Sequence, residues 1–213
     1  MTAFAVLLSI LAAITIGAIS PGPSFVLVSR ISIASSRTHG LASALGMGVG
    51  GALFAALAVL GLTALLMQFE WLYLMLKLLG GAYLVYIAIR IWRGASEPLA
   101  LADTNAPTGG LSISRAFLLG LSTQLSNPKT SIVYASIFAA LMPPAPPLWL
   151  LFALPPMLFC VEAGWYAVVA FVFSGSRARL IYVRLKLWID RGAGAVMGAL
   201  GLKLMVEAFK TRA

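Results

Sequence analysis

The sequence predicts an all-α membrane protein of six transmembrane helices, built as two inverted three-helix repeats. The chain is 61% hydrophobic and only 10% charged, whereas a soluble domain carries roughly 25% charged residues on its surface. Six apolar runs each approach the ~20 residues that cross a bilayer. Proline interrupts the first and the fourth of these runs at equivalent places. Each half holds three spans, so the second half enters the membrane from the opposite side.

The predicted spans form a single transmembrane domain over residues 1–213. We expect repeat A over about 1–92, a cytoplasmic linker over about 93–112 and repeat B over about 113–213. The first run lacks the basic segment and cleavage site of a signal peptide, so we expect it to be retained as a span. The first span can extend as a broken helix to about residue 36. The six expected spans are 3–29, 40–66, 71–92, 113–141, 148–173 and 189–209.

The basic residues predict the orientation of these spans, because cytoplasmic loops carry an excess of Lys and Arg. The loop around Phe69 and the Pro143–Pro147 turn have none, and only the tail after span 6 opposes the pattern. We therefore expect both termini outside and residues 177–188 in a cytoplasmic loop, either ordinary or lying flat on anionic lipid. Ten of the fifteen basic residues lie near one set of loops: Arg30, Arg37, Arg90, Arg93, Arg115, Arg177, Arg179, Arg184, Lys186 and Arg191.

The two proline breaks are the first candidate for a binding site. They are Ser20-Pro21-Gly22-Pro23 in span 1 and Ser126-Asn127-Pro128-Lys129 in span 4. Ser20, and either Ser126 or Asn127, resemble helix N-caps that are followed by proline at the first helical position. Each break then begins a half-helix whose free N–H groups suit an anion such as a carboxylate. The alternative is a pair of proline kinks that only shape the bundle.

Lys129 and Glu162 are the charged residues expected at membrane depth. Lys129 adds a positive charge beside the second break, and Glu162 lies inside span 5. Glu162 has three candidate roles: neutralising Lys129, binding a substrate ammonium, or carrying a proton. A purely structural Glu–Lys pair between spans 4 and 5 is the alternative. Gln124, one turn before the second break, either lines the same cavity or bonds a neighbouring helix, and Asp190 is expected to reach toward the membrane surface.

Several residue types needed by other function classes are scarce. The single cysteine, Cys160, excludes an intrachain disulfide or a thiol relay, and the single histidine, His39, argues against a metal site of His and Cys ligands. The net charge of +9 lies in loops and forms no basic face, so no nucleic-acid partner is expected. We expect no cofactor and no catalytic residue. The expected partners are the lipid bilayer and a small-molecule substrate. A homo-oligomer and a single copy of the chain are both left open as the assembly.

Motifs along essentially the whole chain resemble the lysine-exporter/homoserine-resistance (LysE/RhtB) family. Two of the motifs are the breaks themselves, with Pro21, Gly22 and Pro23 in one and Asn127, Pro128 and Lys129 in the other. The other motifs are Gly46–Gly50, Gly80–Leu84, and Asp190-Arg191 followed by Gly194 and Gly201. The resemblance implies an inner-membrane exporter of amino acids or their derivatives, with proton-driven antiport. One departure is that Gly50-Gly51-Ala52 has no charge where members of the family carry an acidic residue. Coupling in this chain would then depend on Glu162 or differ.

Two further classes remain as alternatives to an amino-acid exporter. A metal-ion exporter needs clustered His, Asp or Glu, while the predicted spans hold essentially Glu162 alone. A non-transporting scaffold or assembly subunit needs no polar residue at depth, and Asn127, Lys129 and Glu162 count against it. Flux into liposomes separates a transporter from a scaffold.

The predicted orientation can be tested with single cysteines, in a background in which Cys160 is replaced. An impermeant thiol reagent should label Ala145→Cys in intact cells and leave Asn105→Cys unlabelled until the membrane is opened. The physical reason is the Lys and Arg bias, which places residue 105 in the cytoplasm. Labelling at 105 and not at 145 would refute the orientation.

Overall fold

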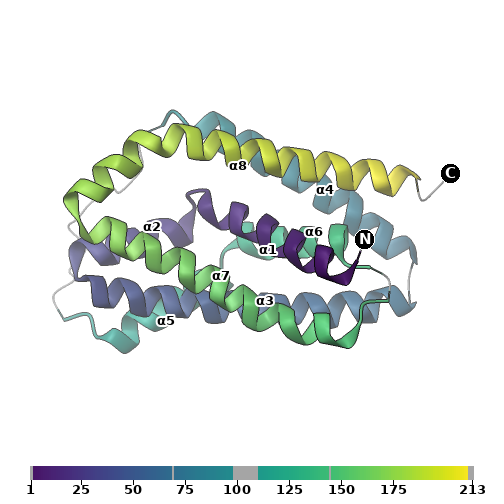
Figure 1. Cartoon of the computed structure of the whole chain (residues 1–213), viewed down its shortest axis with the longest axis horizontal. Helices are drawn as coiled ribbons and strands as arrows, with labels where there is room; N and C mark the ends of the chain where they lie inside the picture. The colour runs from purple at the N-terminus through teal and green to yellow at the C-terminus, as the bar shows by residue number, and fades with distance from the viewer. Residues whose placement is uncertain (1, 69, 98–109, 144, 211–213) are drawn as a thin grey trace.

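The computed structural model describes residues 2–68, 70–97, 110–143 and 145–210, which fold into eight helices and no strand (Figure 1). The predicted all-α class is therefore confirmed. Residues 98–109, most of the predicted cytoplasmic linker, lie outside the described residues. The helices are α1 (Ala3–Ile19), α2 (Pro23–Ala34), α3 (Arg37–Gln68), α4 (Glu70–Gly94), α5 (Ile113–Leu125), α6 (Pro128–Leu141), α7 (Leu148–Ser174) and α8 (Ser176–Lys210).

Both predicted breaks are present. The axes of α1 and α2 differ by 59°, and α5 ends at Leu125 before α6 begins at Pro128. At the second break Asn127 is the N-cap, because its side chain accepts a hydrogen bond from the Lys129 backbone N–H. At the first break the predicted Ser20 cap is wrong. Ser20 and Gly22 both precede a proline and are extended, so the helix resumes one proline later, with Gly22 as N-cap and Pro23 in its first turn.

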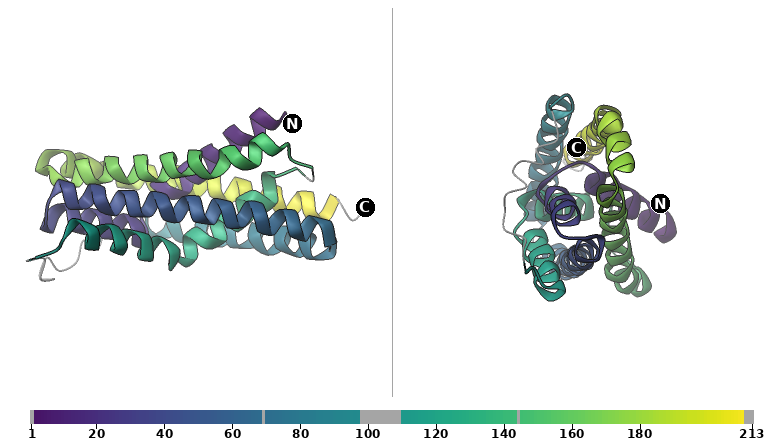
Figure 2. Two further views of the ribbon diagram at one scale, coloured as in Figure 1. Left: turned by 90° about the horizontal axis from the view of Figure 1, so that it is seen from below. Right: turned by 90° about the vertical axis from the view of Figure 1, so that its left-hand side faces the viewer.

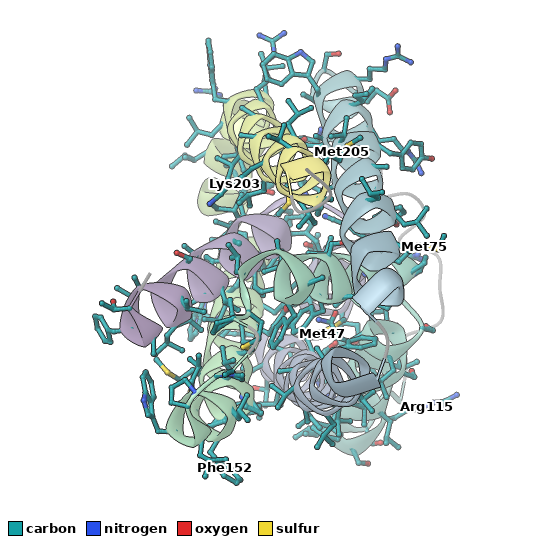
Figure 3. The ribbon with its side chains drawn as sticks, turned by 90° about the vertical axis from the view of Figure 1, so that its right-hand side faces the viewer. Met47, Met75, Arg115, Phe152, Lys203 and Met205 are labelled. Carbon is teal, nitrogen blue, oxygen red and sulfur yellow. The ribbon has the colours of Figure 1, made fainter. Side chains whose placement is uncertain are left out.

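The helices run along the long axis in two groups, with α1, α2 and α6 between them. Figure 1 and the end-on view of Figure 3 show α4 and α8 on one side and α3, α5 and α7 on the other. The most extensive helix contacts are α3 with α7, α4 with α8, and α3 with α5. Helices α1, α2 and α6 lie in the middle, as the end view in Figure 2 also shows. Both halves of the first broken helix and the second half of the other, α6, therefore occupy the centre of the bundle, while α5 packs on α3.

The helix contacts match an exchange of the two halves only in part. In an inverted repeat the first four helices correspond in order to the last four, α1 to α5 and so on. A two-fold axis would then turn the contact α1–α6 into α2–α5 and the contact α1–α7 into α3–α5, and all four contacts are present. Helix α4, however, packs on α6, whereas α8 packs on α1. The inverted repeat therefore stays a prediction.

The length and apolarity of the described helices support some of the predicted spans. Residues Arg37–Gly61 within α3 and the whole of α7 each meet the requirement for a membrane span, and the bent pair α1–α2 meets it if counted as one span. Phe152 of α7, 78% exposed, points away from the bundle, as expected for a side chain in contact with lipid (Figure 3). The count of six spans stays a prediction.

The prediction of an ordinary loop over residues 177–188 is wrong, because α8 is one helix from Ser176 to Lys210. The alternative that this stretch lies flat on anionic lipid stays a prediction, as does its cytoplasmic side. No proline interrupts this stretch, and the pair Lys186–Asp190 lies one helical turn apart on the same face. Asp190 does not reach the membrane surface as predicted, since it is only 3% exposed. The basic residues of this segment thus begin a long helix instead of forming a connection.

Glycines set the close approach of the helices within each group. A Cβ atom on Gly120 of α5 would collide with the Ser43 carbonyl oxygen of α3, and one on Gly46 of α3 would collide with the Phe117 carbonyl oxygen of α5. In the other group, a Cβ on Gly201 of α8 would lie 2.6 Å from the Gly81 carbonyl oxygen of α4. Small residues that allow close backbone contact are typical of helix–helix interfaces in lipid.

We predict that Gly120→Ala destabilises the protein by about 1–3 kcal/mol, the cost of overpacking a tight contact. The new methyl group meets backbone atoms of α3, which cannot rotate away as a side chain would. Gly164→Ala on α7 is the matched control, because nothing lies within 4 Å of a Cβ there. Thermal unfolding in detergent should separate the two variants. Equal midpoints would contradict the assigned α3–α5 packing.

Candidate functional site

A small cavity lies where the two breaks meet. It is lined by the end of α1, the starts of α2 and α6, and the middle of α7. The centre of a water-sized sphere can move through about 20 Å³ of it, which is room for about one or two water molecules. Five predicted site residues line it, namely Ser20, Gly22, Asn127, Lys129 and Glu162.

The other predicted site residues lie beside the cavity instead of on its wall. Pro21, Pro23 and Pro128 shape the two backbone turns. Gln124 is fully buried and bonded to Ser24, which does line the cavity. Whether any of these residues binds a substrate stays a prediction.

Lys129 joins the two breaks directly. Its side chain leaves the first turn of α6, and its Nζ donates a 2.9 Å hydrogen bond to the backbone carbonyl of Ser20, the C-cap of α1. A Cβ on Gly22 would lie 3.6 Å from the same Nζ. The ammonium group therefore lies against the backbone of the first break, at the end of α1 where the helix dipole is negative.

A buried hydrogen-bond network fixes the polar side chains behind Lys129. Ser24 Oγ donates to Gln124 Oε1 at 2.7 Å and accepts from Asn127 Nδ2 at 3.0 Å. Asn127 Oδ1 accepts from the Lys129 backbone N–H at 3.0 Å. The network orients the Asn127 amide, and it ties the start of α2 to both helices of the second break.

Glu162 of α7 lines the same cavity and is only 2% exposed. Its Oε1 accepts a 3.2 Å hydrogen bond from the Tyr134 hydroxyl, while Oε2 has no partner among the described residues. Glu162 forms no salt bridge with Lys129; the salt bridge recorded within the described ranges is Lys186–Asp190. The alternative of a structural Glu–Lys pair therefore has no direct contact to support it.

Gly51 of α3 makes room for the Glu162 side chain. A Cβ at this position would lie 2.7 Å from Glu162 Cγ and 3.0 Å from the Tyr134 hydroxyl. The carboxyl group thus fills the space that a side chain at position 51 would need. The uncharged Gly50-Gly51-Ala52 stretch lies beside an acidic group that α7 supplies.

The cavity combines an ammonium group, a carboxyl group and apolar walls. Its apolar surface comes from Ile14, Gly17, Ala18 and Val133, and hydroxyl groups come from Thr130 and Tyr166. Opposite charges at two sides of a small cavity suit a zwitterion, because each charge of the ligand meets its counter-charge. No group of three His, Cys, Asp or Glu side chains suited to a metal ion is found among the described residues.

Sequence reasoning missed four polar residues on the cavity wall: Ser24, Thr130, Tyr134 and Tyr166. Ser24 directly follows the first break and Thr130 directly follows Lys129, so proximity to the breaks was an available signal. Tyr134 and Tyr166 lie in apolar runs, where a buried tyrosine usually needs a hydrogen-bond partner. Their contact with the cavity depends on how α6 and α7 pack, and no local pattern shows this.

Comparison with known proteins identifies the family of the chain. The family model "LysE type translocator" matches residues 15–208. A threonine efflux protein of Escherichia coli (strain K12) is 34% identical over 192 residues, covering 88% of this chain and 91% of the relative. The threonine efflux protein of Salmonella typhi is 33% identical over 191 residues, with 88% and 91% covered.

The relatives also include proteins without an assigned activity. An uncharacterized membrane protein of Haemophilus influenzae is 28% identical over 192 residues, covering 89% of this chain and 90% of the relative. No solved structure matches the chain significantly. Since the family model spans most of the sequence and the efflux proteins exceed 30% identity over most of its length, the chain belongs to the LysE-type translocator family.

Proposed function

We propose that the protein is a secondary transporter that exports amino acids or their derivatives across the bacterial inner membrane. The observation that carries this proposal is that Lys129 and Glu162 line one cavity at the place where the two helix breaks meet. The relatives named threonine efflux protein support a small amino acid as the substrate.

The substrate carboxylate binds beside Lys129 at the start of α6. The first N–H groups of a helix have no partner within the helix, and the dipole there favours a negative charge. Lys129 adds a full positive charge at the same point and at present donates to the Ser20 carbonyl. A carboxylate would take over this ammonium group with a stronger, charge-assisted hydrogen bond.

The substrate ammonium binds the Glu162 carboxylate. Its unpartnered Oε2 is a free acceptor for this group. Tyr134 holds the other oxygen. In a proton-coupled cycle Glu162 alternates between the substrate ammonium and a proton, because a buried carboxyl group cannot keep an unpaired charge at low cost.

Movement of the broken helices opens the cavity. The present volume accommodates water and excludes an amino acid. Half-helices joined by extended residues at Ser20 and Gly22 can shift without unwinding a whole span. In the proposed orientation, with both termini outside, substrate enters from the side on which α2 ends and α3 begins.

Flux from liposomes tests the proposal against a non-transporting scaffold. The purified protein is reconstituted into liposomes loaded with labelled threonine. These liposomes should release the label faster than protein-free liposomes loaded in the same way. An imposed proton gradient should change the rate. No release of threonine or of other small amino acids would refute the proposal.

We predict that Lys129→Ala and Glu162→Gln each reduce efflux at least about tenfold, because each removes one charge-assisted contact with the zwitterion. Lys129→Ala should also abolish threonine binding to the detergent-solubilised protein. Glu162→Gln should leave exchange of internal for external threonine but remove its dependence on pH.

The control for both variants is insertion and thermal stability equal to wild type within a few degrees. Normal efflux by Glu162→Gln with an unchanged pH profile would show that Glu162 is dispensable. Wild-type binding by Lys129→Ala would remove the carboxylate contact from the proposal.

We further predict that Gly51→Ala lowers efflux severalfold. The added methyl group lies within contact distance of Glu162 and Tyr134, so the carboxyl group must move away from its present place. Gly164→Ala, two residues after Glu162 on the same helix, meets nothing within 4 Å and should export normally. Equal efflux from the two variants would mean that the place of the Glu162 carboxyl group does not matter.

A further inference from the structure

A second buried charge cluster lies between α8 and the end of α4, outside the cavity. Lys186 and Asp190 are 7% and 3% exposed and form a 2.8 Å salt bridge. The same Lys186 Nζ donates to the backbone carbonyls of Gly94 at 2.9 Å and Ala95 at 3.3 Å. We call the Asp190 carboxylate and these two carbonyl oxygens the ammonium cage.

The cage is suited to any primary ammonium group. An ammonium has three N–H donors, and the cage supplies three acceptors around one nitrogen. The carbonyls belong to the end of α4, where the helix dipole is negative and the last C=O groups have no partner within the helix. The Lys186 head group and the α-ammonium of an amino acid are chemically alike.

Stability alone is a poor explanation of the cage. Burying an ion pair costs desolvation that the attraction often fails to offset. Asp190 Oδ1 remains buried without a partner among the described residues, and so does the hydroxyl of Tyr182. A salt bridge that served only to cap the end of α4 would not need the second, unpaired oxygen of Asp190.

One aromatic contact connects the helix of the cage with the helix that begins at the cavity. Tyr182 of α8, eight residues before Asp190, stacks on Phe25 of α2 with ring centroids 5.1 Å apart. Phe25 directly follows the cavity residue Ser24. The aromatic pair therefore links α8, which carries the cage, to the part of α2 that begins at the cavity.

We propose that the ammonium cage is a second binding site for the substrate ammonium, which Lys186 occupies in this structure and leaves when substrate enters. This inference rests on the proposed export of amino acids. Lys186 is a tethered occupant that keeps Asp190 paired between transport cycles. An amino acid coming from the α8 start displaces it, and then passes to Glu162 when Tyr182 and Phe25 separate.

The first test is chemical rescue of Lys186→Ala, which removes the equivalent of n-propylammonium from the side chain. n-Propylammonium chloride should raise the thermal unfolding midpoint of this variant in detergent, because a ligand that binds the folded state stabilises it. The same concentration of sodium chloride should not. Lys186→Ala/Asp190→Asn and Lys203→Ala, an exposed lysine of the same helix, should gain nothing. Absence of rescue in Lys186→Ala would overturn the inference.

The second test is threonine efflux from liposomes. Asp190→Asn should lower efflux about tenfold or more, the range expected for losing one charge-assisted hydrogen bond. Lys186→Gln should retain more efflux than Asp190→Asn and have a lower KM than the wild type, because substrate no longer competes with the tethered ammonium. The double variant Lys186→Gln/Asp190→Asn has no unpaired buried charge, so it should fold and still lose efflux.

A cage that only caps α4 predicts a different pattern. Both single variants would then be impaired alike by the unpaired partner, and the double variant would recover wild-type efflux. That recovery would overturn the inference. A wild type that moves no amino acid would instead refute the proposed function, while the n-propylammonium rescue still decides whether the cage binds a free ammonium.

Discussion

The constraint on which the structure depends is the need to satisfy the backbone groups freed where two helices break inside an apolar bundle. A break leaves the last C=O groups of one half-helix and the first N–H groups of the next without partners. Here Lys129 donates to the freed carbonyl of Ser20, and the Asn127 side chain accepts from the Lys129 N–H. The second break therefore satisfies both itself and the first, so the two must lie side by side.

The helices around the breaks hold them at this distance. Gly46 and Gly120 bring α3 and α5 into backbone contact, and Gly81 and Gly201 do the same for α4 and α8. Packing at glycine contacts leaves little freedom to slide, because the contacting atoms belong to the backbone. Helices α1, α2 and α6 lie between these two tight groups (Figures 1 and 3). In the proposed transport cycle, motion that opens the cavity would thus fall on these three helices and on the boundary between the groups.

The sequence predicts the class, the breaks and the charged residues because each has a local physical cause. Proline cannot continue a hydrogen-bonded helix, so α2 and α6 begin where the prolines lie. The helical start of α8 was missed because a run of basic residues was interpreted as a loop. The Lys186–Asp190 pair and the Gly51–Glu162 contact depend on packing between or along helices, which no single run of residues specifies.

The two halves of the chain contribute different chemistry to the polar sites. Lys129, Glu162, Lys186 and Asp190 all come from the second half, whereas the first half supplies backbone carbonyls at Ser20, Gly94 and Ala95. Carbonyl groups at helix ends accept an ammonium without carrying a full charge, so they bind it and release it at lower cost than a carboxylate. Lys129 donates to such a carbonyl, and Lys186 donates to two of them in addition to its salt bridge with Asp190. Each lysine is therefore bonded in the absence of substrate, and in the proposed cycle each exchanges its partner when a substrate charge arrives.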